Sequence, residues 1–195
     1  MTKVMTPVEW YADLSRALLN VQAKLLDRDA GFETGLDKAK RFIIDTGKCD
    51  ATVWWVGNGG SAAICSHLAQ DVMNKLDIKS FFLGDSSLMT CMANDFGYEN
   101  VYAKPLEKLA GKDDLLIAIS SSGNSPNIIN CVDTIRQKGG RVVSLSGFDK
   151  SNLLWNKNSD VSFFVSSDLY GIVEMAHEAI LHGLIETRWL EMTVD

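Results

Sequence analysis

Two of the three histidines in this chain lie four residues from a carboxylate. His67 and Asp71 are four residues apart in a predicted helix of residues 61–76, so their side chains share one face. In the last predicted helix, Glu178 and His182 have the same spacing. A carboxylate and a histidine commonly move protons in catalysis, and both residue types bind zinc. A surface ion pair is the alternative interpretation and, in general, the more common one.

The last predicted helix, residues 170–191, carries two further candidates, Glu174 and His177. Glu174 and His182 are eight residues apart, which is about 12 Å along a helix axis, so one metal ion could meet both only through extended side chains. His177 and His182 are five residues apart, a rotation of about 140°, and therefore face apart. Spacing alone favours Glu178 over Glu174 as the neighbour of His182, and it predicts for His177 either a structural role or a role in supporting the site residues.

Polar loops follow two of the predicted strands. The strand at 51–57 ends in GNGGS (57–61), where glycines let a ligand approach the backbone and the next helix offers free N–H groups. This is neither a Walker A motif nor a dinucleotide-binding glycine motif, and a plain tight turn is an equally good interpretation. The strand at 115–119 ends in SSSGNS (120–125), which has more hydroxyls than helix capping requires. Hydroxyls beside free backbone N–H groups form a neutral cradle for phosphate.

The pattern from Ala51 onward predicts alternating strands and helices. The strands are mostly apolar without strict alternation, which is typical of a parallel sheet that is buried on both faces. We therefore expect an α/β fold, a three-layer doubly wound sandwich with a five-stranded parallel sheet of the flavodoxin-like type. The predicted strands are 51–57, 79–83, 115–120, 141–146 and 160–165, and the predicted helices are 61–76, 87–95, 99–110, 125–138 and 170–191. Ligands of such sheets bind at the carboxyl ends of the strands, where both polar loops lie.

Two predicted helices, residues 7–28 and 31–46, precede the first predicted strand. The length of 195 residues suits one core, so we expect a single domain of residues 1–195. Within it, residues 1–48 hold the N-terminal helices and residues 49–195 the α/β core. The N-terminal helices could cover their own core or form a subunit interface.

The totals exclude several classes of partner and compartment. A net charge of −6 argues against broad binding to nucleic acid or to anionic membranes. The chain has no signal-peptide pattern and no apolar run near the roughly 20 residues that span a bilayer. Four scattered cysteines indicate reduced thiols. We therefore expect a cytoplasmic protein with no nucleic-acid and no membrane partner.

Three segments together resemble a known family: GNGGS (57–61) followed by His67, ANDFGY (93–98) and ISSSGNS (119–125). They are similar to the sugar isomerase (SIS) domain and, more narrowly, to phosphoheptose isomerases, over nearly the whole chain. The resemblance implies an aldose–ketose isomerase that converts sedoheptulose 7-phosphate to D-glycero-D-manno-heptose 7-phosphate through an enediol. It implies a place in heptose biosynthesis for lipopolysaccharide or capsule. It also implies one Zn²⁺ per subunit and a homotetramer with sites near the subunit interfaces.

The resemblance also implies roles for particular residues. Asp71 would be the catalytic base and His182 the acid. Zinc would be bound by His67, Asp71, Glu174 and His182. Substrate would be bound by Asn58, Gly59, Gly60, Ser61, Asp71, Asn94, Asp95, Ser120, Ser121, Ser122, Ser125 and Glu174.

Three positions depart from the usual family pattern. Asp71 stands where the family usually has glutamate, Glu174 where it has glutamine, and Ser121 where the loop commonly has threonine. Two alternatives therefore stay open. One is an isomerase of another ketose phosphate. The other is a non-catalytic SIS protein that binds a sugar phosphate or a partner protein, as a replication-initiator-binding relative does.

Overall fold

The computed structural model of the chain describes residues 4–194, so the predicted domain ends, residues 1–3 and 195, lie outside the described residues. Its strands are β1 (Gln22–Leu25), β2 (Arg28–Ala30), β3 (Val53–Val56), β4 (Ser80–Phe82), β5 (Leu115–Ser120), β6 (Arg141–Gly147) and β7 (Val161–Val165). Its helices are α1 (Pro7–Leu19), α2 (Phe32–Lys48), α3 (Gly60–Leu76), α4 (Ser86–Phe96), the 3-10 helix η1 (Tyr98–Asn100), α5 (Ala103–Leu109), α6 (Pro126–Gln137) and α7 (Tyr170–Thr193).

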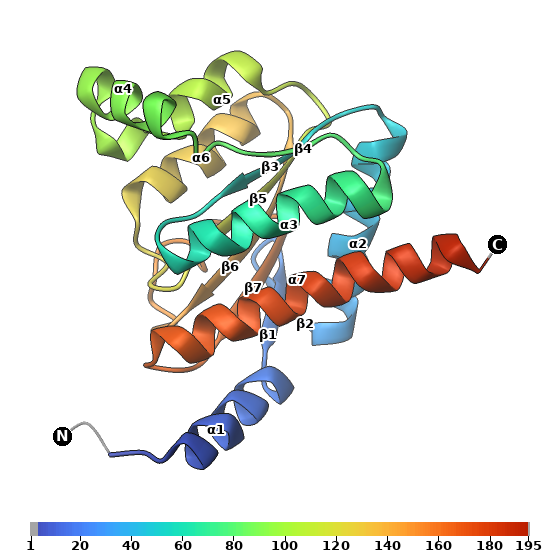
Figure 1. Cartoon of the computed structure of the whole chain (residues 1–195), viewed down its shortest axis with the longest axis vertical. Coiled ribbons are helices and arrows are strands. Elements are labelled where there is room, and N and C mark those ends of the chain that lie inside the picture. Colours follow the sequence, from blue (N-terminus) through green and yellow to red (C-terminus); the bar gives the residue numbers. More distant parts are fainter. Residues whose placement is uncertain (1–3, 195) are drawn as a thin grey trace.

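The strands form one sheet in the order β2-β1-β7-β6-β5-β3-β4 (Figure 1). The five predicted parallel strands are confirmed as β3 to β7. The chain runs from β3 to its neighbour β4 and then crosses to β5 on the other side of β3. The carboxyl ends of β3 and β5 therefore form the switch point at which doubly wound sheets bind ligands.

The prediction of five strands was wrong, because the sheet has two more. The predicted helix at 7–28 was also wrong, because it extends too far along the chain. Helix α1 ends at Leu19, where the Asn20 side chain donates a hydrogen bond to the Arg16 carbonyl (2.8 Å). The next residues form the hairpin β1–β2, and β1 pairs antiparallel with β7, the outermost of the parallel strands. Val21 and Leu25 fit a helical period in the sequence, but pairing with the open edge of β7 outweighs local helix propensity here.

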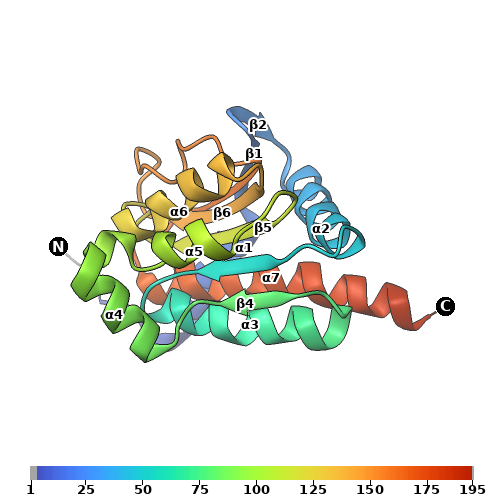
Figure 2. The same cartoon turned by 90° about the horizontal axis from the view of Figure 1, so that it is seen from above.

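Helices cover both faces of the sheet, as a three-layer sandwich requires (Figures 1 and 2). Side chains alternate between the two layers along each strand: Trp55 and Ile117 pack toward α2, α3 and α7, whereas Trp54 and Leu116 pack toward α5 and α6. Burial on both faces explains why the strand sequences lack polar alternation. On the first face, α3 and α7 lie side by side over the sheet.

The two N-terminal helices are placed differently. Helix α2 packs on the sheet through Ala39, Phe42 and Ile43. Helix α1 begins with a capping box formed by Thr6 and Glu9 and lies against α7, away from the sheet (Figure 1). No helix within residues 4–194 combines the length and apolar character that crossing a membrane requires.

Candidate active site

A cavity of about 140 Å³, which we call the serine cavity, lies at the switch point between β3 and β5. It is bounded by the loop after β3, the loop after β5 and the first turns of α7. Its lining residues are Asn58, Ser61, Ile119, Ser120, Ser121, Ser122, Ser125, Tyr170 and Glu174. The structure thus brings both polar loops and Glu174 into one cavity.

In the serine loop, residues 120–125, the Asn124 backbone N–H donates to Ser122 Oγ (3.3 Å), whereas the hydroxyls of Ser120, Ser121 and Ser125 make no such bond to the loop's backbone among the described residues. Ser125 occupies the N-cap position of α6 but makes no capping hydrogen bond, and it instead accepts one from Ser120 Oγ (3.2 Å). Ser121 is 5% exposed, and its buried hydroxyl has no hydrogen-bond partner among the described residues. Gly123 has a φ of +65°, and a Cβ there would lie 2.0 Å from Asn152 Oδ1, so the turn needs glycine. A buried hydroxyl without a partner at the N-terminus of α6 is suited to an anionic ligand.

The loop after β3 is held in place by an amide pair that the sequence analysis missed. Asn58 Nδ2 donates to Asn127 Oδ1 (3.0 Å), and Asn127 Nδ2 donates to Asn58 Oδ1 (2.8 Å). Tyr98 Oη also donates to Asn58 Oδ1 (3.3 Å). Asn127 follows Pro126 on α6 and is almost fully buried, which its sequence position does not reveal. The pair fixes the two polar loops relative to each other.

Asn94 and Asp95 lie outside this cavity. Both are exposed on α4, where Asn94 Nδ2 donates to Asp95 Oδ1 (2.9 Å) and Cys91 Sγ donates to Asp95 Oδ2 (3.6 Å). Neither residue lines the cavity. The hydrogen bond from Tyr98 to Asn58 links the segment that follows α4 to the site.

Gly60 makes room for the Glu174 side chain. A Cβ at Gly60 would lie 2.5 Å from both carboxylate oxygens of Glu174, so any other residue would displace that carboxylate. Gly60 begins α3, whose N-terminus carries a partial positive charge that favours a carboxylate. Glu174 therefore brings negative charge to the rim of the serine cavity, at the position where the family usually has a neutral glutamine.

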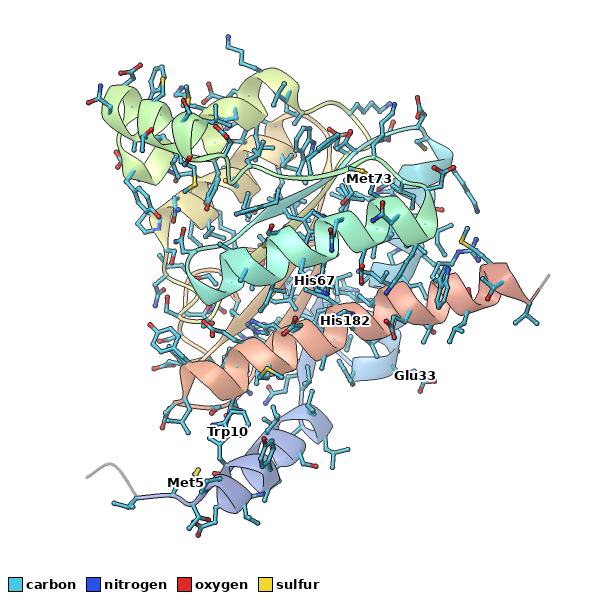
Figure 3. The ribbon with its side chains drawn as sticks, in the orientation of Figure 1. Met5, Trp10, Glu33, His67, Met73 and His182 are labelled. Carbon is cyan, nitrogen blue, oxygen red and sulfur yellow. The ribbon has the colours of Figure 1, made fainter. Side chains whose placement is uncertain are left out.

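A second group of polar side chains lies farther along α3 and α7. His67 and His182 come from the facing sides of these helices (Figure 3), and their ring centroids are 5.3 Å apart. One ligand atom from each of His67, Glu178 and His182 lies within 4.8 Å of the others. Two imidazoles and a carboxylate are a ligand set of catalytic zinc sites, so these side chains fit a divalent metal. Asp71 and Glu174, the other two ligands implied by the resemblance, are not part of this group.

Asp71 lies on the opposite side of the His182 ring from Glu178. His182 Nε2 is 4.0 Å from Glu178 Oε1, whereas His182 Nδ1 is 3.9 Å from Asp71 Oδ2 and 3.9 Å from Glu186 Oε1. Lys75 donates hydrogen bonds to both of these oxygens, at 3.0 Å to Asp71 and 3.1 Å to Glu186. The hydrogen bond with Asp71, followed by that with Glu186, raises the pKa of Lys75. The sequence analysis missed Lys75 and Glu186, although each follows a candidate residue by four positions.

His177 on α7 is fully buried. Its Nε2 donates to the Ser146 carbonyl (3.1 Å), and Ser146 pairs with Ser120 in the sheet. Because burial disfavours the charged ring, the pKa of His177 falls to about 4. This placement agrees with a structural role, one of the two that its spacing indicated.

Comparison with known proteins identifies the class of protein that this fold and site define. The family model for the SIS domain matches residues 14–147. A phosphoheptose isomerase of Photorhabdus laumondii is 34% identical over 93% of this chain and 98% of its own, and one of Proteus mirabilis is 32% identical with the same coverage. A solved phosphoheptose isomerase of Neisseria gonorrhoeae is 24% identical and superposes with a TM-score of 0.81 over 92% of this chain and 95% of its own. The chain belongs to the phosphoheptose isomerase family of SIS-domain proteins.

Proposed function

We propose that the protein isomerises sedoheptulose 7-phosphate to D-glycero-D-manno-heptose 7-phosphate, a step of heptose biosynthesis for lipopolysaccharide or capsule. The observation that carries this proposal is the serine cavity at the switch point, which contains the buried, unpartnered hydroxyl of Ser121. The similarity to enzymes named phosphoheptose isomerase supports the choice of sugar.

The serine loop binds the phosphate in this proposal. Ser120, Ser121, Ser122 and Ser125 supply hydroxyls, and the N-terminus of α6 supplies backbone N–H groups and a favourable dipole. Phosphate held there fixes one end of the sugar. The reacting carbons then lie at a set distance along the seam between α3 and α7.

Asp71 and His182 carry the proton transfers. A ketose becomes an aldose when a base removes a proton from C1, an enediol forms, and a proton is returned to C2. Asp71 is the proposed base and His182 the acid at the oxygens, because their side chains lie together on facing helices (Nδ1 to Oδ2, 3.9 Å). Glu174, which lines the cavity, is the proposed acceptor for sugar hydroxyls.

A zinc ion fits the group formed by His67, Glu178 and His182. Bound there, it would polarise the carbonyl and hydroxyl oxygens of the sugar. Glu178 takes the place that the resemblance gave to Glu174, in agreement with the spacing argument. His182 belongs both to this group and to the acid–base pair. Removal of the metal therefore tests whether proton transfer by His182 is sufficient without metal binding.

The proposed assembly is a homotetramer in the cytoplasm. Support comes from α1, which exposes Val8, Tyr11 and Leu19. Burial of these apolar surfaces against a second copy would stabilise an assembly. Two exposed free cysteines, Cys49 and Cys91, are compatible with a reducing compartment.

A pair of isosteric variants on α7 tests the division of roles. We expect Glu178→Gln to lower zinc affinity by about tenfold or more, measured by competition with a chromophoric chelator, because the cluster loses its carboxylate. Glu174→Gln should keep zinc affinity within about twofold and change the KM for the sugar phosphate instead. The opposite pattern would return the ligand role to Glu174.

Chelation followed by zinc restoration tests the metal in turnover. Loss of turnover on chelation and its recovery with zinc would support a role for the metal in the reaction. Turnover that survives chelation assigns His182 to proton transfer alone. If the best kcat/KM in a panel of ketose phosphates falls on a sugar other than a heptose, the alternative substrate replaces this proposal. Turnover of none of them, together with capture of a protein partner, would favour the non-catalytic alternative.

A further inference from the structure

Lys75 connects the two helices that carry the proposed catalytic residues. It lies one turn after Asp71 on α3 and reaches across to Glu186 on α7. Two of its three ammonium hydrogens are used, one at Asp71 Oδ2 (3.0 Å) and one at Glu186 Oε1 (3.1 Å). We call these three residues the Lys75 clasp.

The same two oxygens face one side of the His182 ring. Asp71 Oδ2 and Glu186 Oε1 are each 3.9 Å from His182 Nδ1. At that separation the carboxylates are not hydrogen-bonded to the ring, so the imidazole itself does not hold them. Within residues 4–194, Lys75 is the cation that the structure shows hydrogen-bonded to Asp71 Oδ2 and to Glu186 Oε1. His182 is a second cation near these oxygens when its ring is protonated.

Electrostatics explains why the clasp matters for Asp71. Two carboxylates beside one ring repel each other, and a side chain as exposed as that of Glu186 would turn toward water without a shared cation. The Asp71 side chain is only 12% exposed, so its carboxylate has few water partners to replace the ammonium. Lys75 therefore offsets the repulsion and restricts the Asp71 rotamer.

We propose that Lys75 is a positioning residue of the isomerase, which holds the Asp71 carboxylate against His182 through the clasp with Glu186. The proposal rests on the proposed function for its kinetic consequence. The orientation of the Asp71 side chain, which is the structural part of the proposal, can be tested without turnover. The clasp leaves His182 Nε2 facing Glu178 on the other side of the ring.

The kinetic test uses Lys75→Met, Lys75→Arg and the control Lys40→Met. Lys40 forms an ion pair with Glu191 and so ties α7 to α2, away from the catalytic residues. We expect Lys75→Met to lower kcat about tenfold with KM changed less than about twofold, because supporting partners of site residues act on the chemical step more than on phosphate binding. Lys75→Arg should recover most of kcat, and Lys40→Met should leave both constants within about twofold. Melting temperatures check that all variants are folded.

Crystal structures of the zinc-free wild type and Lys75→Met test the orientation without turnover. We expect Asp71 Oδ2 to stay beside His182 Nδ1 in the wild type and to rotate away in the variant. The proposal is overturned if Asp71 keeps its place in Lys75→Met, if Lys75→Met has the kcat of Lys40→Met, or if Lys75→Arg is as slow as Lys75→Met. A wild type that turns over no sugar phosphate would contradict the proposed function, while the comparison of Asp71 rotamers would still decide the role of Lys75.

Discussion

At the scale of single residues, phosphate binding can be tested most directly in the serine loop. Its central hydroxyl, that of Ser121, is buried without a partner among residues 4–194, an arrangement that costs stability when no ligand is bound. A bound phosphate would satisfy it. The unpaired hydroxyl of Ser121 therefore lowers the stability of the fold slightly and strengthens the binding of phosphate.

Ser121→Ala should raise the KM for the sugar phosphate by about tenfold, because one hydrogen bond to a charged oxygen is lost. The melting temperature should stay the same or rise slightly, since no satisfied bond is removed. Ser159→Ala is the matched control: Ser159 is also buried, also lacks a partner among the described residues, and lies before the amino end of β7, whereas the serine loop follows the carboxyl end of β5. An equal rise of KM in both variants would argue against phosphate binding by the serine loop.

Much of the site could be predicted at this scale from spacing alone. Glu178 and His182 share a helix face because they are four residues apart, and the structure places their side chains 4.0 Å apart. The contact between Gly60 and Glu174, and the pair of Asn58 with Asn127, join residues far apart in the chain. They depend on how α3, α6 and α7 pack, which no local pattern specifies.

At the scale of elements, α7 is anchored to the sheet through a buried histidine. His177 donates to the carbonyl of Ser146, which lies near the end of β6 and pairs with Ser120 at the end of β5. Burial keeps its ring neutral, with a pKa of about 4 instead of the ordinary 6.5. Because the folded pKa is lower than the unfolded one, the stabilisation is present above pH 6.5 and is lost as pH falls toward 4.

His177→Gln should therefore reduce the acid sensitivity of the fold. The wild type should lose about 2 kcal/mol of unfolding free energy from this group between pH 7.5 and pH 5, whereas glutamine keeps a donor for Ser146 and does not titrate. Urea unfolding of both proteins at the two pH values measures the difference. Equal losses in the wild type and the variant would show that His177 is not the source of the acid sensitivity.

The elements also show where sequence patterns stop being informative. The strands β3 to β7 were predictable because continuous apolar runs between helical segments are typical of a buried parallel sheet. The hairpin β1–β2 was not, because its short strands carry both apolar and charged residues and pair at a sheet edge. Its stability comes from the pairing of Ala23 with Phe163 on β7, a contact between distant parts of the chain.

At the scale of the whole molecule, the fold places two groups of polar residues along the contact between α3 and α7. The serine cavity lies at the start of α3 and α7, and the cluster of His67, Glu178 and His182 lies farther along the same two helices (Figure 3). A phosphate at the first group and a reacting carbon pair toward the second is the arrangement that an aldose–ketose isomerase of an extended sugar phosphate needs. The family membership of the whole chain agrees with this arrangement.

The measurement that tests this account most directly is turnover of sedoheptulose 7-phosphate, followed by NMR in D₂O on the protein with and without added zinc. The account predicts that the ketose signals decrease, that those of an aldoheptose 7-phosphate appear, and that deuterium enters at C2, because the proton that the base removes from C1 exchanges with solvent before one is returned to C2. His182→Ala and Asp71→Asn should abolish the reaction in parallel samples. Unchanged substrate in the wild type with and without zinc would contradict the central claim.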